Sequence, residues 1–281
     1  MVAQLAGAVV RAFIVVIVIA TPALLIPGIS QEGAQVVTLL GLVLAVFVGM
    51  EYAATYPGLI EFRDAPPFNR VRILSLFVTL FLLSLAAKAE PGDSSLALLV
   101  NALGLAIANL LDFQFSPIRV IAGHLPPGMR PFETAMIQAM AGIALLVTVV
   151  AMAVFTLLIR LHQWPNRGSA FNVWINLPTF DPTTRGDVVK RLRRDARVNL
   201  VLGISTPFII PVVGVLAANH MNVAVLTSPH TIVWGLTLWM FIPLSLFMRG
   251  LAMGRIAEMI ALRRARLTAS LDADAPGQPA F

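Results

Sequence analysis

The sequence predicts an all-α protein that crosses a membrane several times. The 281 residues are 58% hydrophobic and only 12% charged, whereas an ordinary soluble domain is about 25% charged. The mean hydropathy is +0.86. The apolar residues also form continuous runs, each near the roughly 20 residues that a helix needs to cross a bilayer. A transmembrane β-barrel would instead alternate apolar and polar residues.

Seven apolar runs are candidate spans, and residues 1–266 are predicted to form a single transmembrane helical domain. The first run lacks a preceding basic segment and contains Arg11, so we expect a retained span rather than a cleaved signal peptide. Proline within a span removes a backbone donor and bends the helix, which predicts a kink in the sixth run. The runs are 6–27, 36–57, 71–88, 95–114, 134–160, 199–219 and 231–249.

The second and third runs are joined by an unusual connection, EYAATYPGLIEFRDAPPFNRVR, at residues 51–72. Proline disfavours a helical conformation in the residue before it, so this stretch should be the structured elbow of a helical hairpin. An elbow of this kind suits either docking to another protein or simple local folding. The charged side chains expected to pair within it are Glu61, Arg63, Asp64 and Arg70.

The fourth run, 95–114, decides the number of spans. If this run is re-entrant, six spans place 17 of the 20 Lys and Arg residues on one side, and the positive-inside rule prefers that distribution. A weak repeat favours seven spans, because it would place two proline-rich loops on one side. We predict seven spans, with six as the alternative, and a cytoplasmic C-terminus. The repeat pairs Pro57, Pro66, Pro67 and Arg70 with Pro117, Pro126, Pro127 and Arg130.

The longest connection, 161–198, is predicted to be a cytoplasmic loop that ends in a basic amphipathic helix near 188–198. Asp187 can cap this helix. One narrow arc is apolar and basic residues cover much of the remainder, a pattern typical of a helix that lies on the membrane surface. Such a helix either binds anionic lipid headgroups or an acidic partner, or serves only as a topology anchor. The apolar arc comprises Val189, Leu192 and Ala196.

The residues expected to bind lipid or a partner come from this helix and from the elbow. They are Lys190, Arg191, Arg193, Arg194, Arg197, Arg63 and Arg70. The last residues, 267–281, are small, polar and proline-bearing, and are predicted to form a flexible tail.

Two carboxylates lie within apolar runs, where burying a charge is costly and ionisable residues are candidates for function. Glu51 and Asp112 each fall late in their runs. If the repeat is real, they lie at similar depths and could form a proton or cation relay. The alternative is that both are hydrated near the interface, or that they pair with Arg63 or Arg119.

Cofactor sites are weakly indicated. The candidate pigment, metal or other cofactor ligands are His124, His220 and His230, which fall in loops or at span ends. The chain has no cysteine, which excludes disulfides, iron–sulfur clusters and thioether-linked haem. Nucleotide-binding motifs are absent. The net charge of +6 reflects membrane topology, and no nucleic-acid partner is expected.

These observations favour a non-catalytic integral subunit or assembly factor of a larger membrane complex, such as a respiratory or photosynthetic one. The expected partners are the lipid bilayer, anionic headgroups and other membrane subunits. The first alternative is a small proton- or cation-coupled transporter or channel that uses Glu51 and Asp112. A further alternative is a lipid or isoprenoid enzyme that uses His124 and Asp181, so catalysis stays an open question.

Two segments, EFRDAPPFNRVR (61–72) and NVWINLPTFDPTTRGDVVKRLRRDARVN (172–199), resemble stretches of uncharacterised inner-membrane proteins of alphaproteobacteria. Together they cover 40 residues. The resemblance implies a multi-pass protein of the bacterial cytoplasmic membrane. It implies no activity, ligand or catalytic residue.

Overall fold

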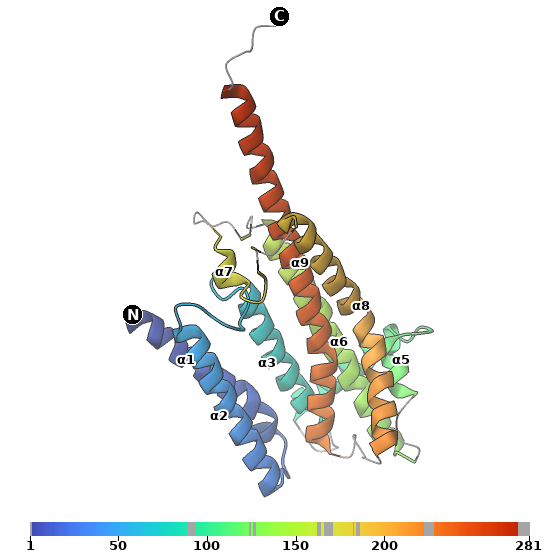
Figure 1. The fold of residues 1–281 in the computed structure, drawn as a ribbon. Helices are drawn as coiled ribbons and strands as arrows, with labels where there is room; N and C mark the ends of the chain where they lie inside the picture. The colour runs from blue at the N-terminus through green and yellow to red at the C-terminus, as the bar shows by residue number, and fades with distance from the viewer. Residues whose placement is uncertain are drawn as a thin grey trace, which may run out of the picture.

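The computed structural model describes residues 2–88, 94–123, 125, 128–161, 164–165, 171–181, 183, 186–221 and 228–274. Every regular element in these residues is a helix, which confirms the all-α prediction (Figure 1). Six helices are long and apolar enough to cross a membrane: α1 (Val2–Leu25), α2 (Gln31–Ala53), α3 (Phe68–Ala86), α6 (Pro131–Leu161), α8 (Val188–Met221) and α9 (Pro229–Asp274). The shorter helices are α4 (Ser95–Leu110), α5 (Pro117–Ala122) and α7 (Val173–Asn176).

Several helices begin at a residue that caps the free backbone N–H groups of the first turn. The side chain of Ser30 accepts a hydrogen bond from the N–H of Gly33 at 3.0 Å, and Ser94 plays the same role for α4. Asn172 caps α7, and Ser116 precedes a proline at the first position of α5. Serine and asparagine at this position stabilise a helix start, so the sequence itself fixes these boundaries.

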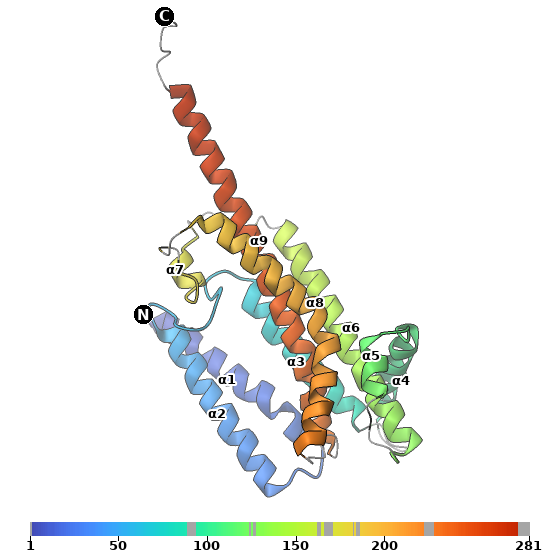
Figure 2. The same ribbon diagram turned by 45° about the vertical axis from the view of Figure 1, so that its right-hand side comes forward.

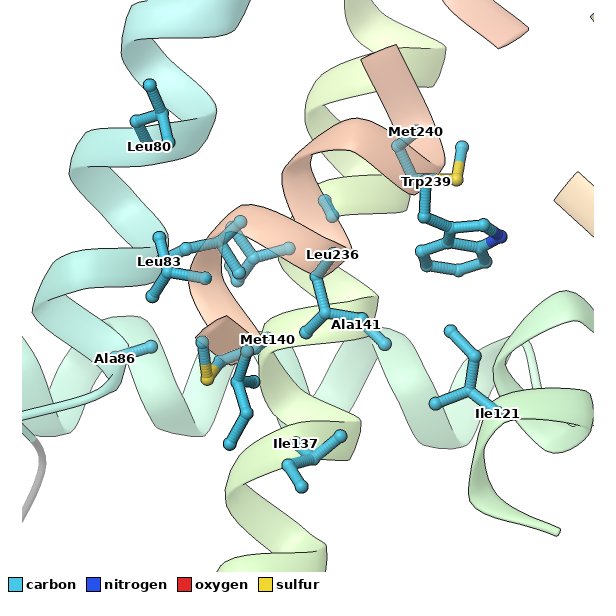
Figure 3. Close-up of a cluster of buried hydrophobic side chains, with 14 of the residues drawn as sticks. Leu80, Leu83, Ala86, Ile121, Ile137, Met140, Ala141, Leu236, Trp239 and Met240 are labelled. Atoms are coloured by element: carbon cyan, nitrogen blue, oxygen red, sulfur yellow. The ribbon is translucent and has the colours of Figure 1, made fainter. Parts of the chain in front are cut away.

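The main core lies where α3, α6 and α9 meet. Figure 3 shows side chains of all three helices converging in this cluster. In lipid, close packing rather than exclusion of water holds helices together, so this interlocked cluster defines the bundle. Its buried members include Leu80, Leu83, Ile137, Met140, Leu236 and Met240.

Helix α4 corresponds to the run 95–114, which was predicted to be the fourth of seven spans, with a re-entrant segment as the alternative. Its 16 residues span about 24 Å at 1.5 Å per residue, less than the roughly 30 Å hydrocarbon core. Both α4 and the short α5 that follows pack on α6 (Figure 2). The backbones of α4 and α6 approach closely at Gly104 and Gly142, where a Cβ on either residue would collide with the other helix. The small residues at this crossing therefore serve packing within the chain.

Helices α8 and α9 form a long hairpin with closely approaching backbones. A Cβ on Gly203 would lie 2.9 Å from the backbone N of Phe247. Helix α8 continues through both of its prolines. Pro211 cannot donate to the carbonyl of Pro207, and the Nε1 of Trp239 donates to that carbonyl at 2.7 Å instead.

The predicted basic helix is the first part of α8 and is continuous with the apolar part that follows. Its apolar arc, which was expected to face the membrane surface, is instead buried in a cluster with α9. The arc residues Val189, Leu192 and Ala196 pack there with Ala252, Met253 and Ile256. Helix α9 continues to Asp274, through residues 267–274 of the predicted tail, and residues 275–281 lie outside the described part.

Several segments that are distant in the sequence meet at one end of the bundle (Figure 1). The side chain of Gln4 donates to the carbonyl of Ala53 at 3.2 Å, which places the start of α1 beside the end of α2. The N–H of Phe62 donates to the carbonyl of Asn176 at 2.7 Å. Arg264 bonds to Asp187 at 2.8 Å. We call this the arginine-rich end, because it gathers the elbow (residues 54–67), the start of α8 and the later part of α9.

Candidate functional site

The elbow is built around Glu51, which caps its backbone. The carboxylate accepts hydrogen bonds from the N–H groups of Gly58, Leu59 and Ile60 at 3.0–3.1 Å. A carboxylate that accepts several backbone N–H bonds is held in its charged form. Glu51 therefore stabilises the backbone of the elbow from its position near the end of α2.

Arg63 completes the elbow from the opposite side. Its Nη1 donates to the carbonyl of Ala54 at 2.6 Å and to that of Glu51 at 2.9 Å. Its Nε donates to Asp64 at 3.1 Å. Only 6% of the side chain is exposed. These bonds satisfy the last carbonyls of α2, which have no partner within the helix.

The elbow is also anchored to the loop before α8. Phe62 adopts a φ of 54° and is fully buried. Its ring packs against Phe68 and Trp164, with centroids 4.4 and 5.8 Å away. The indole of Trp164 donates to the carbonyl of Ala65 at 3.2 Å. The aromatic residues thus hold the elbow on the protein core.

Glu61 links the elbow to the last helix. Its carboxylate accepts hydrogen bonds from the Nε and Nη2 of Arg249 at 2.6 and 2.9 Å. It also accepts one from the hydroxyl of Thr179 at 2.5 Å. Only 12% of the Glu61 side chain is exposed. The prediction of local pairing is therefore confirmed for Arg63 with Asp64, but it is wrong for Glu61.

A cavity of about 1280 Å³ lies beneath the elbow, between the α1–α2 hairpin and helices α3 and α9. We call it the chamber. Much of its wall is apolar, formed by α1, α2 and α9; these residues include Val10, Ile14, Val15, Phe47, Val48 and Leu246. Below it, Val18 of α1 and Ile26, directly after α1, are buried in the main core. The chamber is therefore an apolar space with the elbow across one end.

The end of the chamber at the elbow is strongly cationic. Five arginines and one glutamate line it; the arginines are Arg11, Arg63, Arg70, Arg72 and Arg249. Arg249 is neutralised by Glu61, and Arg63 is bonded to Asp64 and to carbonyls. Arg11 donates to the carbonyl of Gly7 at 2.8 Å, and its guanidinium lies 4.5 Å from the ring centre of Tyr52. The chamber thus carries an excess of positive charge.

Arg72 is the least satisfied of these arginines. Its Nε is buried and has no hydrogen-bond partner. Its guanidinium carbon lies 5.5 Å from the ring centre of Phe68 and 5.6 Å from that of Phe241. A buried donor without a partner is costly. The charge of Arg72 is held against these two rings, within the arginine cluster that lines the chamber.

The basic residues predicted at the start of α8 lie elsewhere, on the outer surface of that helix. Lys190, Arg193, Arg194 and Arg197 are exposed. Arg191 covers the ring of Phe180, with its guanidinium carbon 4.7 Å from the ring centre. None of these five is among the residues that line the chamber. Of the predicted lipid- or partner-binding residues, only Arg63 and Arg70 belong to it.

Asp187, directly before α8, has a lowered pKa. The hydrogen bond from Arg264 lowers the pKa of Asp187, with a smaller contribution from the N–H of Val189. Asp187 therefore caps α8, as predicted, and also ties it to α9.

Glu51 and Asp112 do not meet. Asp112 pairs with Arg119, with the Nε 2.8 Å from Oδ1, and about half of each side chain is exposed. The two carboxylates belong to parts of the molecule that lie on opposite sides of the bundle in both views (Figures 1 and 2). The structure therefore does not bring together the two members of the predicted relay.

The predicted histidine ligands do not form a site in the described residues. His124 lies outside those residues. His220 is exposed at the end of α8, and His230 is partly buried at the start of α9. Among the residues that the structure covers, no group of three or more His, Cys, Asp or Glu side chains could hold a metal ion.

The sequence contained a signal for part of this site. Arg11 had been noted inside the first apolar run, and Arg72 stands at the start of the third. The pairing of Glu61 with Arg249 spans 188 residues, and no local pattern indicates it. Comparisons of the chain with family models, with curated proteins and with solved structures give no match.

Proposed function

We propose that this chain is a multi-pass membrane protein that binds an amphiphilic anion in the chamber. One observation carries the proposal: five arginines, among them Arg72, line one end of an apolar cavity. An anionic headgroup would bond to these guanidinium groups. Charge-assisted hydrogen bonds of this kind are roughly twice as strong as neutral ones.

The apolar wall argues for an amphiphile rather than for a small soluble anion. The chamber lies between the α1–α2 hairpin and the bundle, and its wall below the arginines is formed largely by aliphatic and aromatic side chains. A free phosphate would satisfy the arginines but leave this space to water. Hydrocarbon tails would fill it and would add packing contacts.

The arrangement of charge supports a topology with six spans. The elbow, the start of α8 and the later part of α9 share the arginine-rich end, whereas Lys88 and Arg130 adjoin helix ends at the opposite end. By the positive-inside rule the arginine-rich end is cytoplasmic. The resemblance to alphaproteobacterial proteins extends this proposal to the inner membrane of a bacterium.

The test is lipid binding by the purified protein in detergent, measured by native mass spectrometry with dioleoylphosphatidylglycerol. Arg72→Gln is expected to weaken binding by about tenfold or more, because a lost charge-assisted hydrogen bond is worth about 1.5–3 kcal/mol. The matched control is Arg193→Gln, an exposed arginine at the same end of the bundle. Equal affinity of both variants and the parent protein would contradict the proposal.

A second candidate is the role of subunit or assembly factor in a larger complex, and the surface of α2 favours it. Along this helix, large apolar side chains are exposed; they include Val36, Leu39, Val43, Val46 and Met50, each at least 56% exposed. This surface suits a helix of a partner as well as lipid. Co-purification from the native membrane in mild detergent should yield a stoichiometric partner that Val43→Trp displaces. A clean single species would contradict this role.

The transporter hypothesis stays a prediction. It depended on a carboxylate pair, and the structure separates Glu51 from Asp112. The enzyme hypothesis depended on His124, which lies outside the described residues, and on Asp181. Neither hypothesis gains support from the geometry of the chamber.

A further inference from the structure

A second, smaller hollow adjoins the chamber at the arginine-rich end. It has a volume of about 480 Å³, whereas a water molecule occupies about 30 Å³ in the liquid. It shares four lining residues with the chamber: Gly7, Arg11, Tyr52 and Arg63. The two spaces are therefore neighbours, and a bound molecule could occupy both.

Arg11 and Tyr52 mark the boundary between the two spaces. The guanidinium of Arg11 lies over the Tyr52 ring, 4.5 Å from its centre. Gly7 leaves room for this arrangement, because a Cβ at that position would lie 2.8 Å from the Nη1 of Arg11. An anion held by Arg11 would therefore be accessible from the chamber and from the second hollow.

The second hollow differs from the chamber in chemistry. Its remaining polar lining consists of Gln4, Thr55 and Asp64. The amide Nε2 of Gln4 donates a hydrogen bond to the carbonyl of Ala53 at 3.2 Å. Its Oε1 forms no hydrogen bond with the described residues. Amide oxygen, hydroxyl and carboxylate groups together both donate and accept hydrogen bonds. This mixture suits the hydroxyl groups of a ligand, because a hydroxyl group also both donates and accepts hydrogen bonds.

We propose that the second hollow receives a hydroxylated headgroup carried on the phosphodiester of a lipid whose tails lie in the chamber. This inference rests on the proposed function, because it presumes that an anionic amphiphile occupies the chamber. The phosphodiester lies at the arginines, and the hydroxyl groups beyond it bond to Thr55 and Tyr52. The site therefore prefers a phosphodiester with a polyol headgroup to a phosphomonoester with the same tails.

The test compares two probes with identical dioleoyl tails, phosphatidylglycerol and phosphatidic acid, by native mass spectrometry of the full chain. The parent protein should prefer phosphatidylglycerol by about tenfold, as expected for one or two net hydrogen bonds. Thr55→Val and Tyr52→Phe should each reduce this preference to about twofold. Thr55 does not line the chamber, so Thr55→Val should leave the affinity for phosphatidic acid unchanged. The matched control is Tyr56→Phe, which removes an exposed hydroxyl of the elbow that lines neither space.

The possible outcomes separate the two proposals. Equal binding of the two lipids by the parent protein, or a preference that both variants retain, would overturn the headgroup assignment alone, provided that Arg72→Gln still weakens both lipids. Failure of Arg72→Gln to weaken either lipid would overturn the proposed function and this inference with it.

Discussion

Glu51 and Arg72 are both ionisable residues within helices, but they differ in how far their side chains are hydrogen-bonded. Glu51 is surrounded by backbone N–H groups that hold its charge. Arg72 has a buried Nε without a partner. Buried polar groups are normally hydrogen-bonded, and each exception needs an explanation. Glu51 therefore has a clear structural role, whereas the unpaired Nε of Arg72 is an exception.

Replacing Glu51 by Gln should destabilise the protein. The amide keeps one acceptor oxygen but loses the charge, and a hydrogen bond to a charged group contributes about 1.5–3 kcal/mol. The measurement is the unfolding midpoint in detergent. The matched control is Asp112→Asn, because an exposed ion pair contributes only about 0–1 kcal/mol. An equal loss in both variants would contradict the structural role of Glu51.

Replacing Arg72 by Met should raise the stability of the lipid-free protein. Methionine keeps an unbranched chain between Phe68 and Phe241 and removes a buried donor whose lack of a partner costs about 1–3 kcal/mol. Added phosphatidylglycerol should then stabilise the parent protein but not the variant. Thermal unfolding with and without lipid measures both effects. A variant that is less stable without lipid would indicate that Arg72 is needed for folding itself.

At the scale of elements, the crossing of α4 and α6 depends on the absence of side chains at two positions. A methyl group on Gly142 would meet the carbonyl of Gly104 and would lie 3.0 Å from the N of Ala108. Both contacts are with backbone, which cannot move aside as a flexible side chain can. This crossing therefore fixes the position of α4 against α6.

Gly142→Ala should therefore destabilise the protein by about 1–3 kcal/mol, the usual cost of overpacking. The control is Gly235→Ala in α9, where a Cβ would have no neighbour within 4 Å. That change should be neutral or stabilising by up to about 1 kcal/mol, because alanine favours a helix. Unfolding by denaturant in detergent measures both. Similar results for the two variants would show that the α4–α6 contact is not tight.

At the scale of the whole molecule, the arrangement of helices predicts the sidedness of the chain. With six spans, the elbow and the end of α9 face the same compartment, and the start of α2 faces the other one. With seven spans, the elbow and the end of α9 would be on opposite sides. The chain has no cysteine, so single cysteines report on this directly.

Tyr56→Cys and Thr268→Cys are expected to behave alike towards a membrane-impermeant maleimide. Both should react only when the cytoplasmic face of the membrane is accessible to the reagent. Gln31→Cys should react from the other face, since it lies at the opposite end of α2. The measurement is labelling in intact cells and in inverted vesicles. Labelling of Tyr56→Cys and Thr268→Cys from different faces would favour seven spans instead.

Composition and run length were enough to predict the helical membrane class, because the apolar content leaves few other folds. The existence of the elbow also followed from its prolines. The orientation of the first part of α8 could not be predicted in this way. Apolar residues such as Val189 and Leu192 are expected whether that face contacts lipid or a neighbouring helix. The chamber could not be predicted at all, since its lining combines α1, α2, α3 and α9, and only tertiary packing brings these helices together.

The ion pair between Glu61 and Arg249 also sets an order of events during biosynthesis. The two residues are 188 positions apart, which corresponds to about 10–40 s of translation at 5–20 residues per second. During that interval the first two helices can already be in the membrane, although Arg249, the ion-pair partner of Glu61, has not yet been synthesised. The ion pair that joins the elbow to α9 at the wall of the chamber therefore forms only after the last helix has been synthesised.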